Sequence, residues 1–130
     1  MRGKYSEIIN AAWQAQRRAY APYSHFAVGA ALQTKEGKIF CGVNVENSAY
    51  GLSICAERSA LFSAVSSGYR EFSFLAVVSD SARPIRPCGA CRQVLAEFDA
   101  ELPIILVGSN GEVEITSLME LFPQPFSLTR

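Results

Sequence analysis

Apolar side chains recur at spacings of three and four along the first twenty residues. The stripe consists of Tyr5, Ile8, Ile9, Ala12, Trp13, Ala19 and Tyr20. This spacing predicts an amphipathic helix of about four turns over residues 5–20, which Ala21-Pro22 ends. Ser6 is expected to cap the start of this helix. A helix with a single apolar stripe buries it against another layer of structure.

Two strand patterns follow this helix. Residues 26–32 are almost continuously apolar, which is typical of a strand covered on both faces. After a turn at residues 35–37, residues 39–45 alternate, with Ile39, Cys41, Val43 and Val45 on one face and Phe40, Gly42, Asn44 and Glu46 on the other. We expect these two strands to form a hairpin.

The second half of the chain alternates helices and strands. The pattern predicts a helix over 55–67 with Gly68 as its C-cap, a strand over 72–78, a loop over 79–87 and a helix over 88–98. A strand at 104–107 and a hairpin signal at Asn110-Gly111 lead to a strand at 113–115. Thr116 is expected to cap a last short helix that ends before Pro123. This order fits an α/β fold with helices on both faces of a five-stranded mixed sheet.

Composition narrows the class of protein. The chain has 130 residues, 49% of them hydrophobic and 18% charged, which predicts one globular domain over residues 1–130. The charges of twelve basic and twelve acidic side chains cancel, so the formal net charge is zero. The balance argues against a nucleic acid polymer or an anionic membrane as partner, although a free nucleoside needs no such charge. The sequence shows neither an apolar run long enough to span a bilayer nor a signal segment, so we expect a cytoplasmic location with reduced thiols.

Four cysteines stand at positions 41, 55, 88 and 91. An even number is compatible with disulfides, but the Cys88-x-x-Cys91 spacing in a reducing compartment favours metal or redox chemistry. Cys55 and Cys88 each open a predicted helix, where the helix dipole favours thiolates. Three converging thiolates point to one zinc ion with an open fourth position for water, as in catalytic sites. Cys41 lies mid-strand, and we interpret it as a small core residue.

Glu57 stands two residues after Cys55, in the first turn of the predicted helix. An acid there can simply complement the helix dipole. Beside an open zinc site, however, a carboxylate can take a proton from water and return it to a substrate. Cys55-Ala56-Glu57 followed by Pro87-Cys88-x-x-Cys91 matches the three-cysteine form of the zinc deaminase signature.

The chain resembles the small zinc-dependent cytidine deaminases along nearly its whole length. The residues that carry the resemblance are 21–26 (APYSHF), 28–31 (VGAA), 42–47 (GVNVEN), Tyr50-Gly51, 55–58 (CAER) and 87–93 (PCGACRQ). The resemblance implies a three-layer α/β/α fold, one zinc ion per chain, and hydrolytic deamination of cytidine and deoxycytidine to uridine and deoxyuridine with release of ammonia, a reaction of pyrimidine salvage. It also implies a homotetramer whose subunits share active sites.

Within the chain, the resemblance assigns roles to residues that could contact the substrate. It implies that Asn44 and Glu46 hold the ribose hydroxyls, and strand alternation independently places both on one face. Phe26 resembles an aromatic wall against the nucleoside, with a plain core aromatic as the alternative. The backbone N–H of Ala56 is expected to meet the pyrimidine carbonyl oxygen.

The resemblance also reaches beyond the pocket of one chain. Tyr50 resembles a residue that enters a neighbouring subunit's site, and Phe126 resembles a C-terminal phenylalanine that covers the base from another subunit. Arg58 is expected to donate to a ligand sulfur and offset the negative charge of a tris-thiolate zinc site. His25, the only histidine in the chain, has no part in the motif.

Two other functions remain open at this stage. One is a zinc deaminase for another base or for an antibiotic nucleoside, which the Asn44-x-Glu46 pair argues against. The other is a zinc-stabilised binding module without catalysis, which would need a fourth ligand. Cys41 is the only cysteine left for that role.

Overall fold

A five-stranded mixed sheet runs through the centre of the computed structural model, which describes residues 2–128. The strands are β1 (Val28–Thr34), β2 (Ile39–Val43), β3 (Phe72–Ser79), β4 (Pro103–Val107) and β5 (Val113–Ser117). Their order across the sheet is β2-β1-β3-β4-β5. The β3–β4 pair is parallel and the other neighbours are antiparallel. The predicted mixed sheet and the β1–β2 hairpin are therefore confirmed.

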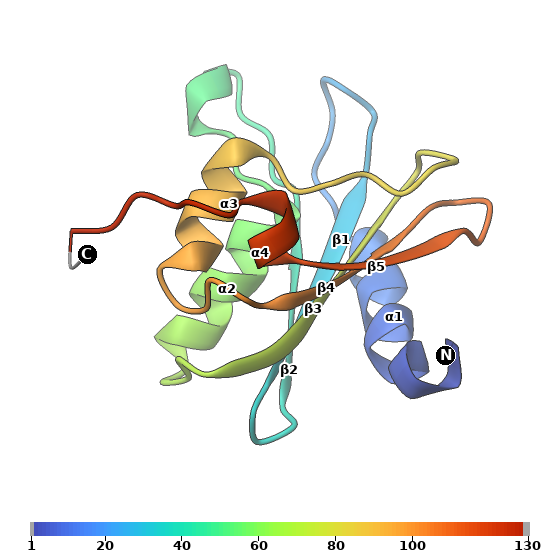
Figure 1. Cartoon of the computed structure of the whole chain (residues 1–130). Helices are drawn as coiled ribbons and strands as arrows, with labels where there is room; N and C mark the ends of the chain where they lie inside the picture. The colour runs from blue at the N-terminus through green and yellow to red at the C-terminus, as the bar shows by residue number, and fades with distance from the viewer. Residues whose placement is uncertain (1, 129–130) are drawn as a thin grey trace.

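Helices cover both faces of this sheet (Figure 1). On one face lies α1 (Arg2–Gln16), and on the other lie α2 (Ala56–Ser66), α3 (Gly89–Ala96) and the short α4 (Leu118–Leu121). A 3₁₀ turn, η1 (Tyr50–Leu52), which the sequence pattern did not predict, precedes α2. The three-layer α/β/α architecture is confirmed. Within the part of the chain that the structure describes, the search for a helix long and apolar enough to cross a membrane finds none.

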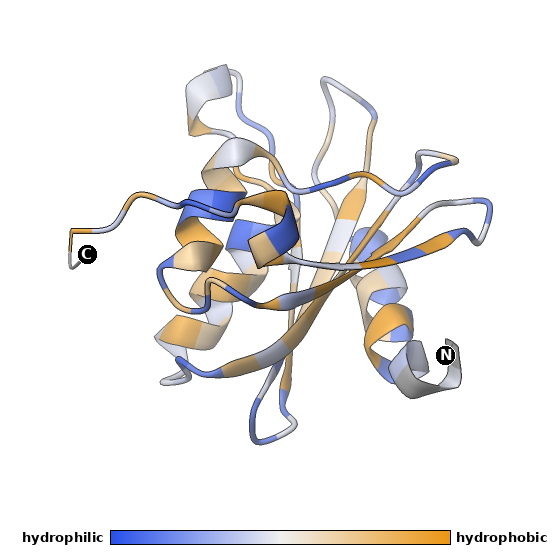
Figure 2. Ribbon diagram, viewed as in Figure 1, coloured by the Kyte–Doolittle hydropathy of each residue, from blue (hydrophilic) through white to orange (hydrophobic). Residues whose placement is uncertain are grey.

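The sheet separates two hydrophobic clusters. The larger lies under α2 and α3 and contains fully buried Leu32, Leu75 and Ile104, while the smaller lies under α1 and contains Ile8 and Ala12. The helices carry both hydrophobic and hydrophilic bands, as expected where one face of each covers the sheet (Figure 2).

The alternation along β2 distributes its side chains as predicted. Phe40 packs against the larger cluster, whereas Ile39 and Cys41 pack against the smaller one. Cys41 is half-buried, and its thiol approaches the carbonyl oxygen of Ala11 in α1 at 3.7 Å. This placement agrees with its interpretation as a core residue.

The first helix is shorter than its apolar stripe predicts, and its cap is not Ser6. The helix already includes Arg2, and the Ser6 hydroxyl donates to the carbonyl of Gly3 inside it. The helix ends at Gln16 because Tyr20 pairs with the segment after β2. The Tyr20 N–H donates to the Asn44 carbonyl at 3.0 Å, and the Tyr20 carbonyl accepts from Glu46 N–H at 2.9 Å. Long-range pairing thus overrides local periodicity.

Other boundaries differ by a few residues. The first strand begins at Val28 rather than at residue 26, and the second ends at Val43 rather than at 45. The cap of α4 is Ser117, whose hydroxyl accepts from Glu120 N–H at 3.2 Å, so the assignment of Thr116 was wrong. Gly68 follows α2 with a φ of 97°, as expected of a C-cap glycine.

Candidate active site

Two helix N-termini bring three cysteines together. Cys55 and Cys88 occupy the N-cap positions of α2 and α3 with extended backbone, and Cys91 lies buried in the first turn of α3. The Sγ atoms of Cys55 and Cys88 are 3.7 Å apart, and those of Cys88 and Cys91 are 3.5 Å apart. All three sulfurs lie within 4.8 Å of one another, which confirms the predicted convergence.

The position of α2 depends on Gly42 in β2. A Cβ atom at Gly42 would lie 2.2 Å from the nitrogen of Ala60 and 2.4 Å from the carbonyl oxygen of Ala56. Real Cβ atoms do not approach backbone atoms so closely, so a residue without a side chain is required there. The first turn of α2 therefore packs directly on β2, and this packing sets where Cys55 and Glu57 stand.

Arg58 supplies positive charge to the sulfur cluster. Its Nη2 atom donates to the Sγ atom of Cys55 at 3.5 Å. Its Nε atom is buried and has no hydrogen-bond partner among residues 2–128. A hydrogen bond from the Cys91 thiol, together with the one from Arg58, lowers the pKa of Cys55 to about 5. The same hydrogen bond between Cys91 and Cys55 raises the pKa of Cys91. The expected contact of Arg58 with a ligand sulfur is thus present.

The donor set fits zinc. Thiolates are preferred zinc ligands, and two helix N-termini and an arginine offset their negative charge. All four cysteines are free thiols, and Cys41 lies on the α1 side of the sheet. Within residues 2–128, the only group of potential metal ligands is Cys55, Cys88 and Cys91. Three protein ligands leave one tetrahedral position open, which is the arrangement of catalytic zinc sites.

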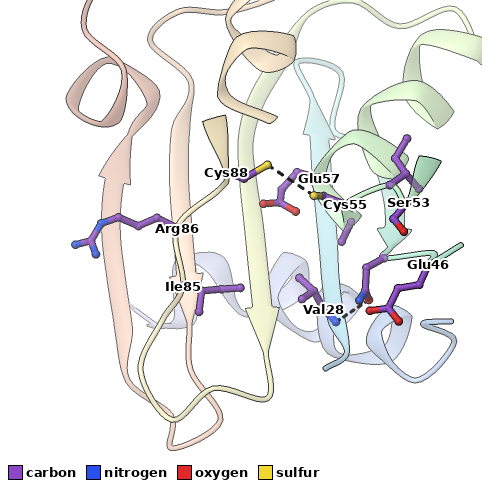
Figure 3. Close-up of a pocket in the computed structure, with 11 residues that line it drawn as sticks. Val28, Glu46, Ser53, Cys55, Glu57, Ile85, Arg86 and Cys88 are labelled. Atoms are coloured by element: carbon purple, nitrogen blue, oxygen red, sulfur yellow. Dashed lines mark hydrogen bonds between the residues drawn. The ribbon is translucent and has the colours of Figure 1, made fainter. Parts of the chain in front are cut away.

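Glu57 lies in the first turn of α2, and its side chain is only 4% exposed. Burial, together with the negative charge of Cys55, raises the pKa of Glu57 to about 7. Figure 3 shows its carboxylate beside the sulfurs of Cys55 and Cys88. A carboxyl group with such a pKa can both hold and release a proton near neutral pH.

A pocket of about 250 Å³ opens beside the sulfur cluster and Glu57. Besides Cys55, Glu57 and Cys88, its lining consists of Val28, Asn44, Glu46, Ser53, Ile54, Ala56, Ile85 and Arg86. The Arg86 side chain points away from the sulfurs (Figure 3), and its Nη2 atom pairs with Glu114 at 2.7 Å. One pocket therefore contains the predicted metal site and also Asn44 and Glu46, the two residues predicted to bind the ribose.

Asn44 and Glu46 lie at this pocket but also bind their own chain. The Asn44 side chain accepts from Val28 N–H at 2.9 Å and donates to the Phe26 carbonyl at 2.8 Å. The Glu46 carboxylate accepts from the N–H groups of Tyr23 and Ser24 and from the Ser24 hydroxyl. The Ser24 hydroxyl, with the two backbone groups, lowers the pKa of Glu46.

Three further residues near the pocket differ in their placement. Ala56 is fully buried and begins α2, so its N–H has no acceptor inside the helix. Phe26 is partly buried against the larger core cluster and is not among the residues that line the pocket, where Val28 lies instead. His25 is exposed, with a φ of 58°, in the loop that holds Glu46.

Tyr50 and Phe126 lie outside this pocket. Tyr50 is 75% exposed and makes an edge contact with Tyr23, at 6.2 Å between ring centroids. Phe126 is 69% exposed, and its carbonyl accepts from Gln93. Within one chain, the structure brings neither residue to the sulfur cluster.

Several residues of the site carry no local sequence signal that predicts their roles. Ser24 belongs to the quoted motif, but its hydrogen bonds to Glu46 depend on a contact across the fold that no local pattern signals. Ser53, Ile54 and Ile85 line the pocket from loops without periodicity. Their proximity in sequence to Cys55 and Cys88 is the one signal that could have indicated them.

The geometry agrees with comparisons to known proteins. Residues 2–107 match the model of the cytidine and deoxycytidylate deaminase zinc-binding region. The chain belongs to this deaminase family. The family's zinc-binding region and the group of three thiols described above fit one zinc ion per chain.

Individual deaminases are similar over nearly the full length. A cytidine deaminase from Sporosarcina psychrophila is 49% identical over 122 residues, which cover 93% of this chain and 90% of that protein. The crystal structure of a cytidine deaminase from Burkholderia pseudomallei superposes with a TM-score of 0.91 at 52% identity, covering 94% of this chain and 98% of that one. A blasticidin-S deaminase from Bacillus cereus is 32% identical, over 93% of this chain and 91% of that protein.

Proposed function

We propose that this deaminase hydrolyses cytidine and deoxycytidine to uridine and deoxyuridine and releases ammonia. The observation that carries the proposal is the pocket in which three clustered thiols, a buried Glu57 and the Asn44-x-Glu46 pair meet. The cytidine deaminases from Sporosarcina psychrophila and Burkholderia pseudomallei, each about half identical to this chain, support the same substrate.

Zinc held by Cys55, Cys88 and Cys91 would acidify a water molecule and so supply hydroxide near neutral pH. Glu57 takes the proton that this water loses, because its pKa of about 7 lets it accept and donate at that pH. It passes the proton to the pyrimidine nitrogen next to the amino-bearing carbon, and hydroxide adds to that carbon. Glu57 then moves the proton of the newly added hydroxyl group to the amino group, so that the C–N bond breaks, ammonia leaves and a carbonyl forms at that carbon.

The first turn of α2 positions the base for this transfer. Ala56 stands between Cys55 and Glu57, and its N–H can donate to the pyrimidine carbonyl oxygen because it has no acceptor within the helix. Phe26 does not line the pocket itself, but it stands two residues before Val28, which does, and we propose that its ring contacts the nucleoside when the substrate is bound. Arg58 donates a hydrogen bond to the sulfur of Cys55 and so stabilises its thiolate. Proton transfer to the substrate is the task of Glu57.

Asn44 and Glu46 bind the ribose hydroxyls at the end of β2. Glu46 keeps a lone pair on Oε2 after its contact with the Ser24 hydroxyl, and its lowered pKa keeps it ionised as an acceptor. The second N–H of the Asn44 side-chain amide is available beside its bond to Phe26. Recognition of ribose favours a nucleoside over the free base.

We further propose that the active enzyme is a homotetramer whose subunits share sites. Tyr50 and Phe126 are large and exposed and do not line the pocket of their own chain, which suits residues that enter a neighbour's pocket. Four reduced thiols and a net charge of zero support a cytoplasmic enzyme that acts on free nucleosides rather than on a nucleic acid polymer or at a membrane.

The position of Cys41 argues against a closed, non-catalytic zinc module. Its thiol approaches Ala11 in α1, on the opposite face of the sheet from the other three sulfurs. A fourth thiolate ligand is therefore absent within residues 2–128, and the fourth position stays open.

The direct test follows the ultraviolet absorbance of cytidine with purified, zinc-loaded protein, and compares deoxycytidine, free cytosine and blasticidin S. We expect turnover of both nucleosides and little turnover of cytosine. Turnover of blasticidin S alone would assign the chain to an antibiotic deaminase. No turnover of any of the four by protein that contains one zinc ion per chain would contradict the proposed function.

A further inference from the structure

Residues 26–28, here called the wall segment, lie at the edge of the pocket, and each of their backbone N–H and carbonyl groups has a hydrogen-bond partner. Ser24 Oγ accepts from Phe26 N–H at 3.1 Å, and Asn44 binds both the Phe26 carbonyl and Val28 N–H. Asp80 Oδ2 accepts from Ala27 N–H at 3.1 Å, and Gln16 Nε2 donates to the Ala27 carbonyl at 3.0 Å. Side chains thus hold Phe26 and Ala27, whereas Val28 is also held by the backbone of Asn44 and by its pairing with Ser79 in β3.

The contacts to Ala27 come from residues that play no part in the deaminase motif. Gln16 is the last residue of α1, and Asp80 directly follows β3. The two side chains also bind each other, with Gln16 Nε2 donating to Asp80 Oδ1 at 2.7 Å. One amide and one carboxylate therefore close a ring of three hydrogen bonds around the peptide groups of Ala27.

Neighbouring backbone fixes the position of both side chains. A Cβ atom at Gly29 would lie 2.2 Å from the Ala12 carbonyl oxygen and 2.9 Å from the Gln16 nitrogen, so the end of α1 packs directly on β1. Val28 pairs with Ser79 across β1 and β3, which places Asp80 beside the start of β1. Gln16 and Asp80 thus approach Ala27 from two elements that the core holds rigidly.

We propose that Asp80 and Gln16 are positioning residues that set the wall of the nucleoside pocket. They hold Ala27 and thereby place Val28, which follows it, against the substrate, and they set the backbone of Phe26, which precedes it. Val28 itself lines the pocket. This inference rests on the proposed function, since the wall matters for catalysis only if the pocket takes a nucleoside.

The test combines steady-state kinetics with amide hydrogen exchange on zinc-loaded protein. For Asp80→Ala and Gln16→Ala we expect KM for cytidine to rise about 3- to 10-fold, kcat to stay within about twofold, and zinc content to stay unchanged, because ground-state placement and not proton transfer is impaired. The Ala27 amide should exchange at least about tenfold faster in Asp80→Ala, since it loses its acceptor. Because Gln16 and Asp80 share a hydrogen bond, the fold-increase in KM of the double variant should be smaller than the product of the two single-variant increases.

Matched controls separate this role from general effects of the substitutions. Asp99→Ala removes a carboxylate that accepts from the backbone N–H of Glu101, and Gln33→Ala removes an amide that donates to the Gly37 carbonyl, both away from the pocket. We expect wild-type KM for both. Asp80→Asn keeps one acceptor oxygen for Ala27 N–H, so its KM should lie between those of wild type and Asp80→Ala.

Two results would overturn the inference. One is a KM in Asp80→Ala equal to that of Asp99→Ala, together with unchanged exchange at Ala27. The other is a fall in kcat that follows a loss of zinc, which would mean that Asp80 supports the metal site instead of the wall. The exchange measurement needs no turnover. If the wild-type protein fails to deaminate cytidine but Asp80→Ala still speeds exchange at Ala27, the proposed function is contradicted and the hydrogen bond between Ala27 and Asp80 is established.

Discussion

The carboxylate of Glu46 receives three hydrogen bonds from two consecutive residues of its own chain. Oε1 accepts from the N–H groups of Tyr23 and Ser24, and Oε2 accepts from the Ser24 hydroxyl. These contacts fix the orientation of the carboxylate before any substrate arrives. A side chain oriented in advance loses little conformational freedom when a ribose hydroxyl binds, and this is how the loop of residues 23–24 contributes to recognition.

Replacing Glu46 by alanine should weaken nucleoside binding without loss of metal. We expect kcat/KM for cytidine to fall about 10- to 100-fold, the range for a lost hydrogen bond to a charged acceptor, while zinc content stays at one per chain. Glu101→Ala, at an exposed glutamate away from the pocket, is the control. Equal wild-type activity on free cytosine and cytidine would contradict the ribose role.

At the scale of elements, the metal site depends on how closely α2 approaches β2. Gly42→Ala should force these elements apart, because its Cβ would lie 2.2 Å from the Ala60 nitrogen. We expect a loss of about 1–3 kcal/mol in the free energy of unfolding, as for other overpacked sites, and a measurable loss of bound zinc.

Gly51→Ala is the matched substitution, since no atom lies within 4 Å of a Cβ at that position. Thermal unfolding and metal analysis of the two variants check the prediction. If Gly42→Ala unfolds at the same temperature as Gly51→Ala and retains full zinc, the packing of α2 on β2 does not set the site.

The elements that carry the metal were predictable because their signals are local. Cys55 and Cys88 stand at helix starts that the apolar pattern and Pro87 mark within one or two residues. The end of α1 was not predictable in this way, because Tyr20 continues the helical stripe while its backbone pairs with Asn44 and Glu46. Ser24, Gln16 and Asp80 acquire their roles through contacts of the same long-range kind.

At the scale of the whole molecule, several large apolar side chains are exposed in the segments around residues 20–23 and 45–52 and in the C-terminal segment. Tyr50 and Phe126 are among them, and the others in and around the loops before α2 are Tyr20, Tyr23, Val45 and Leu52. The C-terminal segment after α4 passes along α3 (Figure 1), where Gln93 Nε2 donates to the Phe126 carbonyl at 3.0 Å. The sequence could indicate that Phe126 follows two prolines, but one chain alone does not determine which subunit it serves.

Shared sites predict recovery of activity in mixed oligomers. Phe126→Ala should lower kcat/KM about 10- to 100-fold if its ring stacks on the base. When Glu57→Ala and Phe126→Ala chains are unfolded and reassembled together, some sites regain Glu57 from one chain and Phe126 from another. The mixture should then exceed the summed activity of the two variants refolded separately.

Native mass spectrometry confirms that mixed oligomers have formed before activity is compared. If mixed tetramers are present and the activity equals the simple sum, Phe126 does not serve a neighbouring site. A protein that stays monomeric at working concentration and still turns over cytidine would contradict site sharing altogether.

The central claim is that Glu57 moves protons at a zinc site made by Cys55, Cys88 and Cys91. The most direct measurement compares zinc content, uridine binding and cytidine turnover in Glu57→Gln and wild type. Glutamine keeps the shape of the buried side chain but cannot take up a proton. We therefore expect full zinc, retained uridine binding and a turnover lower by at least about 10²- to 10⁴-fold. A fully zinc-loaded Glu57→Gln protein that keeps a tenth of the wild-type turnover would contradict the account.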